Sequence, residues 1–231
     1  MKREFKSEML RSERIWGLVF IPIHIFALPL LLGIIVSSTG FSASDAQWNL
    51  IVFAISCAAL FIIMFRFLRT SFRVMTGNFK DAVIGLLLGA VIYLGLLMAL
   101  GLILQELPFE APNPNSAQVD RMFRENPNAI LAVGVIFAPI VEELMYRGAL
   151  FGTIRLKSRF LAYIVSIFVF GAIHILQYAI VDFDVLLLIN VAQYIPPSIA
   201  LAYCYERSGG IWPPIFLHAM INLFVFKAAG G

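Results

Sequence analysis

The stretch AILAVGVIFAPIVEELMYRGALFG, residues 129–152, decides the fold class of this chain. It is long and apolar enough to cross a membrane as a helix, yet it contains Glu142, Glu143 and Arg147. Charged side chains at membrane depth are costly, so they face the interior of a bundle or a water-filled cavity and mark functional sites. The stretch therefore predicts a helical membrane protein with a polar centre inside it.

The remainder of the chain has the same apolar character. Of its 231 residues, 61% are hydrophobic and only 13% are charged, a composition typical of polytopic membrane proteins. Pro196 and Pro197 interrupt one span, which is therefore expected to be kinked or split into two helices. The predicted fold is an all-α transmembrane helical bundle of seven or eight spans, with residues 1–231 forming one integral membrane domain. The expected spans are residues 16–38, 48–66, 82–104, 129–152, 160–181, 184–205 and 212–226.

Basic residues are distributed unevenly between the two ends of these spans. Of the 17 Lys and Arg residues, all but Arg121, Arg124 and Lys227 fall in the leader or in the second, fourth and sixth connections. By the positive-inside rule, the N-terminus is predicted to be cytoplasmic and the C-terminus external, in the cell membrane. No nucleic-acid motif is present, so membrane lipid is the expected partner of this charge. The sequence does not determine the oligomeric state.

The two glutamates of the charged span have different expected surroundings. Glu143 and Arg147 are i and i+4 on a helix and can form an ion pair, which on its own is compatible with a purely structural role. Glu142 points about 100° away from Glu143 and is not part of that pair. An unpaired carboxylate at depth has no packing role, and it is suited to accept a proton from water.

Histidines supply the second part of the predicted site. His174 ends the segment FGAIH (170–174), and His218 begins HAMIN (218–222), which places Asn222 one turn after His218 on the same face. His24 has no polar companion at helical spacing and is interpreted as a packing or interfacial residue. The glutamates, His174 and the His218–Asn222 pair lie in three separate spans, and their convergence would form a site.

These residues carry a family resemblance. The segments EELMYR (142–147), FGAIH and HAMIN are similar to the motifs E-E-x-x-x-R, F-x-x-x-H and H-x-x-x-N of the CAAX protease and bacteriocin-processing (CPBP, or Abi) family of intramembrane proteases. CYERSGGIWPPIFLHAMIN (204–222) also resembles the run into the last motif. The resemblance covers a core of residues 129–226, and the first three spans match only as apolar helices. The best-understood branch is the type II CAAX prenyl endopeptidases.

The resemblance implies an endopeptidase that cleaves membrane-associated peptides or proteins, including prenylated CAAX-type substrates, at a site toward the cytoplasmic side. It implies that Glu142 activates water with the help of His174, that His218 and Asn222 stabilise the oxyanion, and that Glu143 and Arg147 support them. Glu142, His174 and His218 are also candidate zinc ligands, since three protein ligands and an open position form a catalytic zinc site. Our preferred mechanism needs no cofactor, because a zinc ligand role for Glu142 would leave only the paired Glu143 as a base.

Two other classes of function remain open at the sequence level. A catalytically silent membrane adaptor or immunity protein could use the same scaffold, although the intact set of motif residues argues against it. A proton-coupled carrier could also use intramembrane carboxylates and histidines, although no internal repeat is detectable. Two further expectations are structural: Gly85 and Gly89 of GLLLG mark helix packing within one chain, and Cys57 and Cys204 are buried thiols.

Overall fold

The computed structural model describes residues 5, 7–108 and 112–229, and within these it is entirely helical. The basic leader residues Lys2, Arg3 and Lys6, which contribute to the predicted orientation, lie outside the described residues. The first half of the chain contains α1 (Arg11–Pro22), η1 (Ile23–Ala27), α2 (Leu28–Thr39), α3 (Asp45–Ile63), α4 (Phe65–Gly77) and α5 (Phe79–Gln105). The second half contains α6 (Pro114–Glu125), α7 (Pro127–Ala132), η2 (Val133–Phe137), α8 (Ala138–Glu142), η3 (Glu143–Phe151), α9 (Gly152–Arg155), α10 (Arg159–Val181), α11 (Leu186–Ala192), α12 (Ile195–Ser208) and α13 (Trp212–Ala229).

The predicted fold class is confirmed: the chain is an all-α, polytopic membrane protein. Within the described part of the chain, six helical segments are long and apolar enough to cross a membrane. The sixth of them is split as predicted, because α11 ends at Ala192 and α12 begins at Ile195, just before the two prolines. The six segments are Arg11–Thr39, Asp45–Ile63, Phe79–Gln105, Pro127–Arg155, Arg159–Val181 and Leu186–Ser208.

The expected seventh span, residues 212–226, forms the helix α13. It is not among the six candidate spans found in the described part of the chain, so a seventh crossing stays a prediction. Its buried residues Leu217 and Ile221 pack in one cluster with Leu201 of α12, so α13 is held against the bundle.

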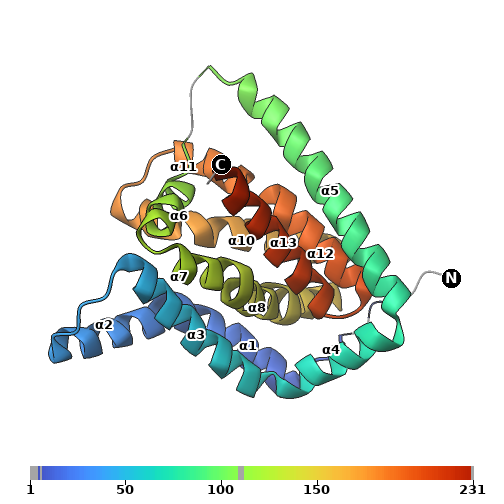
Figure 1. Cartoon of the computed structure of the whole chain (residues 1–231). Helices are drawn as coiled ribbons and strands as arrows, with labels where there is room; N and C mark the ends of the chain where they lie inside the picture. The colour runs from blue at the N-terminus through green and yellow to red at the C-terminus, as the bar shows by residue number, and fades with distance from the viewer. Residues whose placement is uncertain (1–4, 6, 109–111, 230–231) are drawn as a thin grey trace.

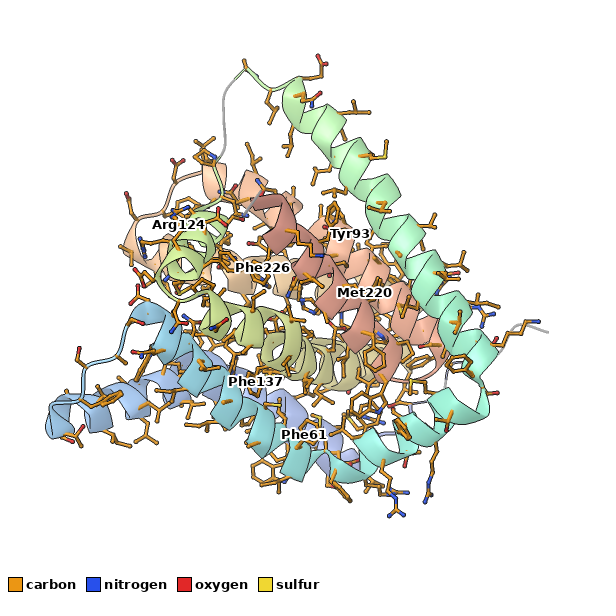
Figure 2. All side chains as sticks on the ribbon, in the orientation of Figure 1. Phe61, Tyr93, Arg124, Phe137, Met220 and Phe226 are labelled. Atoms are coloured by element: carbon orange, nitrogen blue, oxygen red, sulfur yellow. The ribbon has the colours of Figure 1, made fainter. Side chains whose placement is uncertain are left out.

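The helices form a bundle whose outer surface is apolar. In Figure 1, α5 runs along one edge, α1 and α3 run along another, and α7, α8, α10, α12 and α13 lie between them. Figure 2 shows side chains projecting outward from α3 and α5, where Ile62 and Met98 are 80% and 71% exposed. Apolar side chains so exposed are stable only against lipid, so the outer faces of these helices are the membrane contact surface.

The two glycines of GLLLG let α5 approach α12 closely, as predicted. A Cβ at Gly85 would lie 3.1 Å from the Ser208 Cβ and 3.2 Å from the Ser208 backbone nitrogen. A Cβ at Gly89 would lie 2.7 Å from Leu217 Cδ2 and 3.3 Å from the Ala200 carbonyl oxygen. Both glycines therefore serve packing within the chain.

We expect Gly89→Val to destabilise the protein by about 1–3 kcal/mol, because the added side chain meets Leu217 and a helix backbone that cannot move. Gly95→Val is the matched control, since Gly95 lies on the same helix and has no neighbour within 4 Å of an added Cβ. Thermal unfolding of both variants in one detergent measures the difference. Equal midpoints for the two variants would contradict the close approach of α5 to α12.

Three segments depart from α-helical geometry into π-helix: η1, η2 and η3. A π-helix is rare and often lies at a functional site, because it leaves backbone groups free for other partners. In η2 the carbonyl of Gly134 accepts a hydrogen bond from Asn222 Nδ2 of α13 at 2.8 Å. The glycine permits this contact, because a Cβ at position 134 would lie 2.4 Å from Phe226.

Residues outside the predicted site behave as expected. His24 is buried in η1, and its Nδ1 lies 2.7 Å from Ser56 Oγ of α3, so it is a satisfied packing histidine. Cys57 and Cys204 are both buried free thiols. These residues take no part in the arrangement described next.

Candidate active site

Glu142, His174 and His218, predicted from three separate motifs, lie together in the interior of the bundle. Glu142 is the last residue of α8, and the two histidines come from α10 and α13. Glu142 Oε2 lies 3.9 Å from Nε2 of each histidine. This oxygen is buried, and no group of the described residues forms a hydrogen bond with it. A buried carboxylate oxygen requires a donor, so the geometry calls for one between these three side chains.

The other ring nitrogen of each histidine faces an acceptor. His174 Nδ1 lies 2.6 Å from the Phe170 carbonyl oxygen, and His218 Nδ1 lies 2.9 Å from Glu143 Oε1. Because an imidazole must donate to a carbonyl or carboxylate, we assign the proton of each neutral ring to Nδ1. Both Nε2 atoms then present lone pairs toward Glu142. Three acceptors converge on one point, where a molecule that donates hydrogen bonds, or a cation, fits.

Glu143 and Arg147 form the ion pair that their spacing allows. Arg147 Nη1 donates to Glu143 Oε1 at 3.0 Å, and both side chains are fully buried. The Arg147 guanidinium also lies over the Phe170 ring, 4.3 Å from its centroid. Glu143 Oε1 also accepts a hydrogen bond from His218 Nδ1–H, so this pair connects the charged span to α13. The pair therefore fixes the orientation of His218.

Two aromatic side chains form a wall of the site: Phe170, which belongs to the second motif, and Tyr194, which no motif contains. The Tyr194 ring stacks on the His174 ring with centroids 4.3 Å apart, and the Phe170 centroid lies 4.7 Å from His174. The Tyr194 hydroxyl accepts hydrogen bonds from the side-chain amides of Asn113 and Asn115, at 3.2 Å and 3.1 Å. Tyr194 thus joins His174 to the start of α6. No spacing rule places Tyr194 beside His174, so sequence reasoning missed it.

Asn222, the third predicted polar residue of the motifs on α10 and α13, binds the backbone of η2. Its amide nitrogen donates to the Gly134 carbonyl oxygen. Within the described ranges, no hydrogen bond joins Asn222 to Glu142, His174 or His218. The structure therefore shows Asn222 binding α13 to η2, and its predicted role at an oxyanion stays a prediction.

The two histidines lie at different distances from the ends of their helices. At 1.5 Å per residue, His174 is about 10 Å from the Val181 end of α10 and about 22 Å from the Arg159 end. His218 is about 9 Å from the Trp212 end of α13, which follows the sixth connection, predicted to be cytoplasmic. The site therefore lies between the two ends of the bundle, and the predicted access from the cytoplasmic side stays a prediction.

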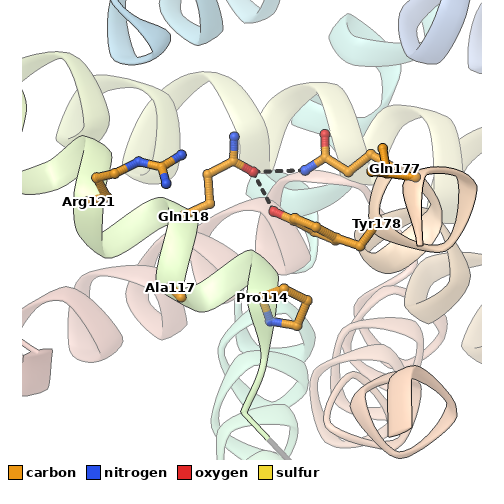
Figure 3. A pocket seen from close by; sticks show the side chains of 7 residues that line it. Pro114, Ala117, Gln118, Arg121, Gln177 and Tyr178 are labelled. Carbon is orange, nitrogen blue, oxygen red and sulfur yellow. Dashed lines mark hydrogen bonds between the residues drawn. The ribbon is translucent and has the colours of Figure 1, made fainter. Parts of the chain in front are cut away.

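A pocket of about 460 Å³ lies between α6 and the Val181 end of α10. Gln118 Oε1 accepts hydrogen bonds from Gln177 Nε2 at 2.9 Å and from the Tyr178 hydroxyl (Figure 3). Gln177 and Tyr178 are three and four residues after His174, so the pocket is one helical turn beyond the histidine on the same side of α10. The lining residues are Pro114, Ala117, Gln118, Arg121, Gln177, Tyr178 and Val181.

Zinc can be tested against the same three side chains. Their chemistry fits a zinc site, because two imidazole Nε2 atoms and a carboxylate are typical ligands and each Nδ1 binds an acceptor. Their spacing fits less well: ligand atoms around tetrahedral zinc lie about 3.4 Å apart for bonds of about 2.1 Å, whereas Glu142 Oε2 lies 3.9 Å from Nε2 of each histidine. A water with hydrogen bonds of about 2.8 Å spans 3.9 Å without any movement.

The fold and the site define a class: a polytopic helical membrane protein with a buried centre of glutamate and histidine. Within that class, residues 124–224 match the family model described as Type II CAAX prenyl endopeptidase Rce1-like. The matched segment contains all three motifs, so the family resemblance inferred from them is confirmed.

Two curated relatives match the same part of the chain. "Putative membrane peptidase YdiL" of Bacillus subtilis (strain 168) is 35% identical over 97 residues, which are 42% of this chain and 35% of the relative. "UPF0177 protein YaiF" of Lactococcus lactis subsp. lactis is 36% identical over 105 residues, 43% of this chain and 41% of the relative. The match therefore spans less than half the length of each relative. No solved structure matches the chain.

Proposed function

We propose that this protein is an intramembrane endopeptidase that hydrolyses peptide bonds with a water activated by Glu142. The observation that carries the proposal is the buried Glu142 Oε2, which lacks a partner among the described residues and lies at equal distance from two histidine Nε2 atoms. The family match to type II CAAX prenyl endopeptidases and the relative named a putative membrane peptidase support peptide hydrolysis as the reaction.

The proposed mechanism begins with a water that donates hydrogen bonds to Glu142 and to a histidine Nε2. Glu142 removes a proton as the water oxygen attacks the peptide carbonyl carbon, and a tetrahedral intermediate forms. Protonated Glu142 then gives this proton to the leaving amine nitrogen, and the C–N bond breaks. The burial of the site strengthens each of these interactions, because competing solvent is excluded.

His174 and His218 position the water in this mechanism. Each ring is fixed through its Nδ1, by the Phe170 carbonyl and the Glu143 carboxylate respectively. The Nε2 lone pair that accepts the second hydrogen bond of the water holds its oxygen in place while Glu142 removes the proton. If zinc were bound instead, Glu142, His174 and His218 would hold it, and the metal would polarise the carbonyl and acidify the water.

We propose that the peptide enters from the α6 end and that the pocket of Figure 3 receives part of it. Gln118 and Gln177 each use one group to bind the other, which leaves a donor and an acceptor for a peptide backbone. The Arg121 side chain is 59% exposed; its Nη2 lies 3.6 Å from Asp45 Oδ2, and its other N–H groups can bind the carboxylate of a substrate. The proposed substrates are membrane-associated peptides or proteins, with prenylated CAAX-type peptides as one class to be tested.

A cleavage assay on purified protein in lipid tests this function. The panel comprises the same membrane-associated peptide with and without a prenyl group, with and without an amidated C-terminus. We expect a new N-terminus to form by hydrolysis, detected by mass spectrometry. Absence of cleavage across the panel, together with intact peptide binding, would favour the silent adaptor; proton uptake coupled to solute entry in vesicles would favour the carrier.

Chelation distinguishes the two ways of activating water. Dialysis against a strong chelator is expected to leave kcat within about twofold of its starting value, because the spacing fits a water held by side chains alone. Metal content measured on the same sample by mass spectrometry is the control. Loss of activity that returns only with added zinc would show that the preferred mechanism is wrong.

A further inference from the structure

Helix α4 connects two candidate membrane spans and presents three distinct faces. Phe67, Leu68 and Ser71 are buried against the bundle. The exposed residues form two adjoining stripes: the aromatic residues Phe65 and Phe72 along one edge, and the basic residues Arg66, Arg69 and Arg73 along the face beside it. In the positive-inside pattern these arginines belong to the second connection between spans.

Contacts from two other parts of the chain hold α4 in place. Glu13 Oε1 of α1 accepts a hydrogen bond from the Phe67 backbone N–H at 2.8 Å and so caps the first turn. Trp212 Nε1 at the start of α13 donates to the Leu68 carbonyl oxygen at 3.1 Å. In Figure 1, α4 runs along the edge of the bundle from the end of α3 to the start of α5. Because both neighbours are candidate spans, α4 lies at the boundary of the membrane.

The charge on α4 has no acidic counterpart among the residues that the structure describes. Arg66, Arg69 and Arg73 are all exposed, and none of them forms an ion pair with a described residue. By contrast, Arg155 and Arg159 both bind Glu206, and Arg207 binds Asp81. The three arginines of α4 are therefore available to an anion from outside the chain.

The aromatic stripe identifies the source of that anion. Phe65 and Phe72 are 63% and 51% exposed beside the arginines. A helix facing only water would not expose two phenyl rings, whereas a helix in the interfacial plane of a membrane buries such rings among acyl chains and keeps its arginines at the headgroups. A guanidinium binds a phosphate with two parallel hydrogen bonds, which a lysine does not.

We propose that α4 is a binding site for anionic phospholipid headgroups, with Arg66, Arg69 and Arg73 on the phosphates and Phe65 and Phe72 inserted beside them. This proposal does not depend on the proposed peptidase activity. Each basic side chain near an anionic membrane surface raises the binding constant for that surface by about fivefold. Since α4 contacts Trp212 at the start of the helix that carries His218, the bound lipid also holds that helix in position.

Trp212 provides a local reporter for the test. Its ring lies 6.2 Å from the Phe72 ring, centroid to centroid. In a variant with Trp16→Phe and Trp48→Phe, Trp212 is the only tryptophan. The protein is placed in phosphatidylcholine bilayers that contain either brominated phosphatidylglycerol or brominated phosphatidylcholine, at equal bromine content. We expect stronger fluorescence quenching by the anionic lipid, corresponding to a relative binding constant of about fivefold or more.

Charge variants decide between a specific site and general attraction. Replacing Arg66, Arg69 and Arg73 by Gln in this background is expected to bring the relative binding constant to about 1, and 0.5 M NaCl is expected to reduce the wild-type preference. The control R121Q/R124Q removes charge from α6 and should leave the preference intact. Thermal unfolding checks that each variant is folded. Equal quenching by both lipids, or a preference that survives in the triple variant, would overturn the proposal.

Discussion

Glu142→Gln is expected to lower kcat for peptide cleavage by about 10³-fold or more, while KM changes little. Glutamine keeps the shape of glutamate but cannot accept the proton of the attacking water. The thermal midpoint of the variant should be equal to or above that of the wild type, because a buried carboxylate oxygen with no partner among the described residues is replaced by a neutral group. Initial rates on a membrane-bound peptide and thermal unfolding in the same lipid measure both effects.

Glu125→Gln is the matched control, since Glu125 is an exposed glutamate on α6 and should retain full activity. A Glu142→Gln protein that cleaves at the wild-type rate would exclude Glu142 as the base. The same variant separates the other functions: a silent adaptor would keep partner binding unchanged, and a carrier would lose its proton coupling.

Glu143→Gln is expected to destabilise the protein by about 3–5 kcal/mol, the largest effect on folding that we predict. The substitution leaves the guanidinium of Arg147 fully buried without a counter-charge. Arg147 Nε and Nη2 already have no hydrogen-bond partner among the described groups, so the pair depends on Nη1 and on the Phe170 ring. Loss of folded protein or a large fall in the thermal midpoint is the expected result.

Removing both charges should restore folding, because a buried ion pair can be replaced by apolar side chains at little cost. The double variants E143Q/R147M and E143L/R147M then separate stability from positioning. Glutamine still offers an oxygen to His218 Nδ1, whereas leucine does not, so E143L/R147M should be slower than E143Q/R147M by about 10-fold or more. Equal rates for the two folded double variants would show that Glu143 serves only to pair Arg147.

The parts of the fold that the sequence predicts are those governed by local chemistry. Apolar length identified the spans, and the missing N–H of Pro196 and Pro197 identified the break between α11 and α12. The amphipathic helix α4 was read as a connection, because its capping carboxylate, Glu13, comes from a helix far away in the sequence. The position of α13 within the bundle also depends on contacts between distant helices.

In the candidate site, too, local features could be predicted from the sequence, and contacts between distant helices could not. Helical spacing was sufficient to predict the Glu143–Arg147 pair, and motif resemblance was sufficient to select Glu142, His174 and His218. Neither reveals the acceptors that orient the two imidazole rings, since one is a backbone carbonyl and the other lies on a different helix. Tyr194 was missed for the same reason. The contact between Asn222 and Gly134 depends on the local π-helix of η2, which no sequence rule predicts.

The most direct test is an experimental structure of the wild-type protein at a resolution that shows ordered water, with diffraction data collected on both sides of the zinc absorption edge. We predict one density peak without anomalous signal, about 2.8 Å from Glu142 Oε2 and from at least one of the two histidine Nε2 atoms. An anomalous zinc peak in that position, or side chains packed against one another with no solvent between them, would contradict the account.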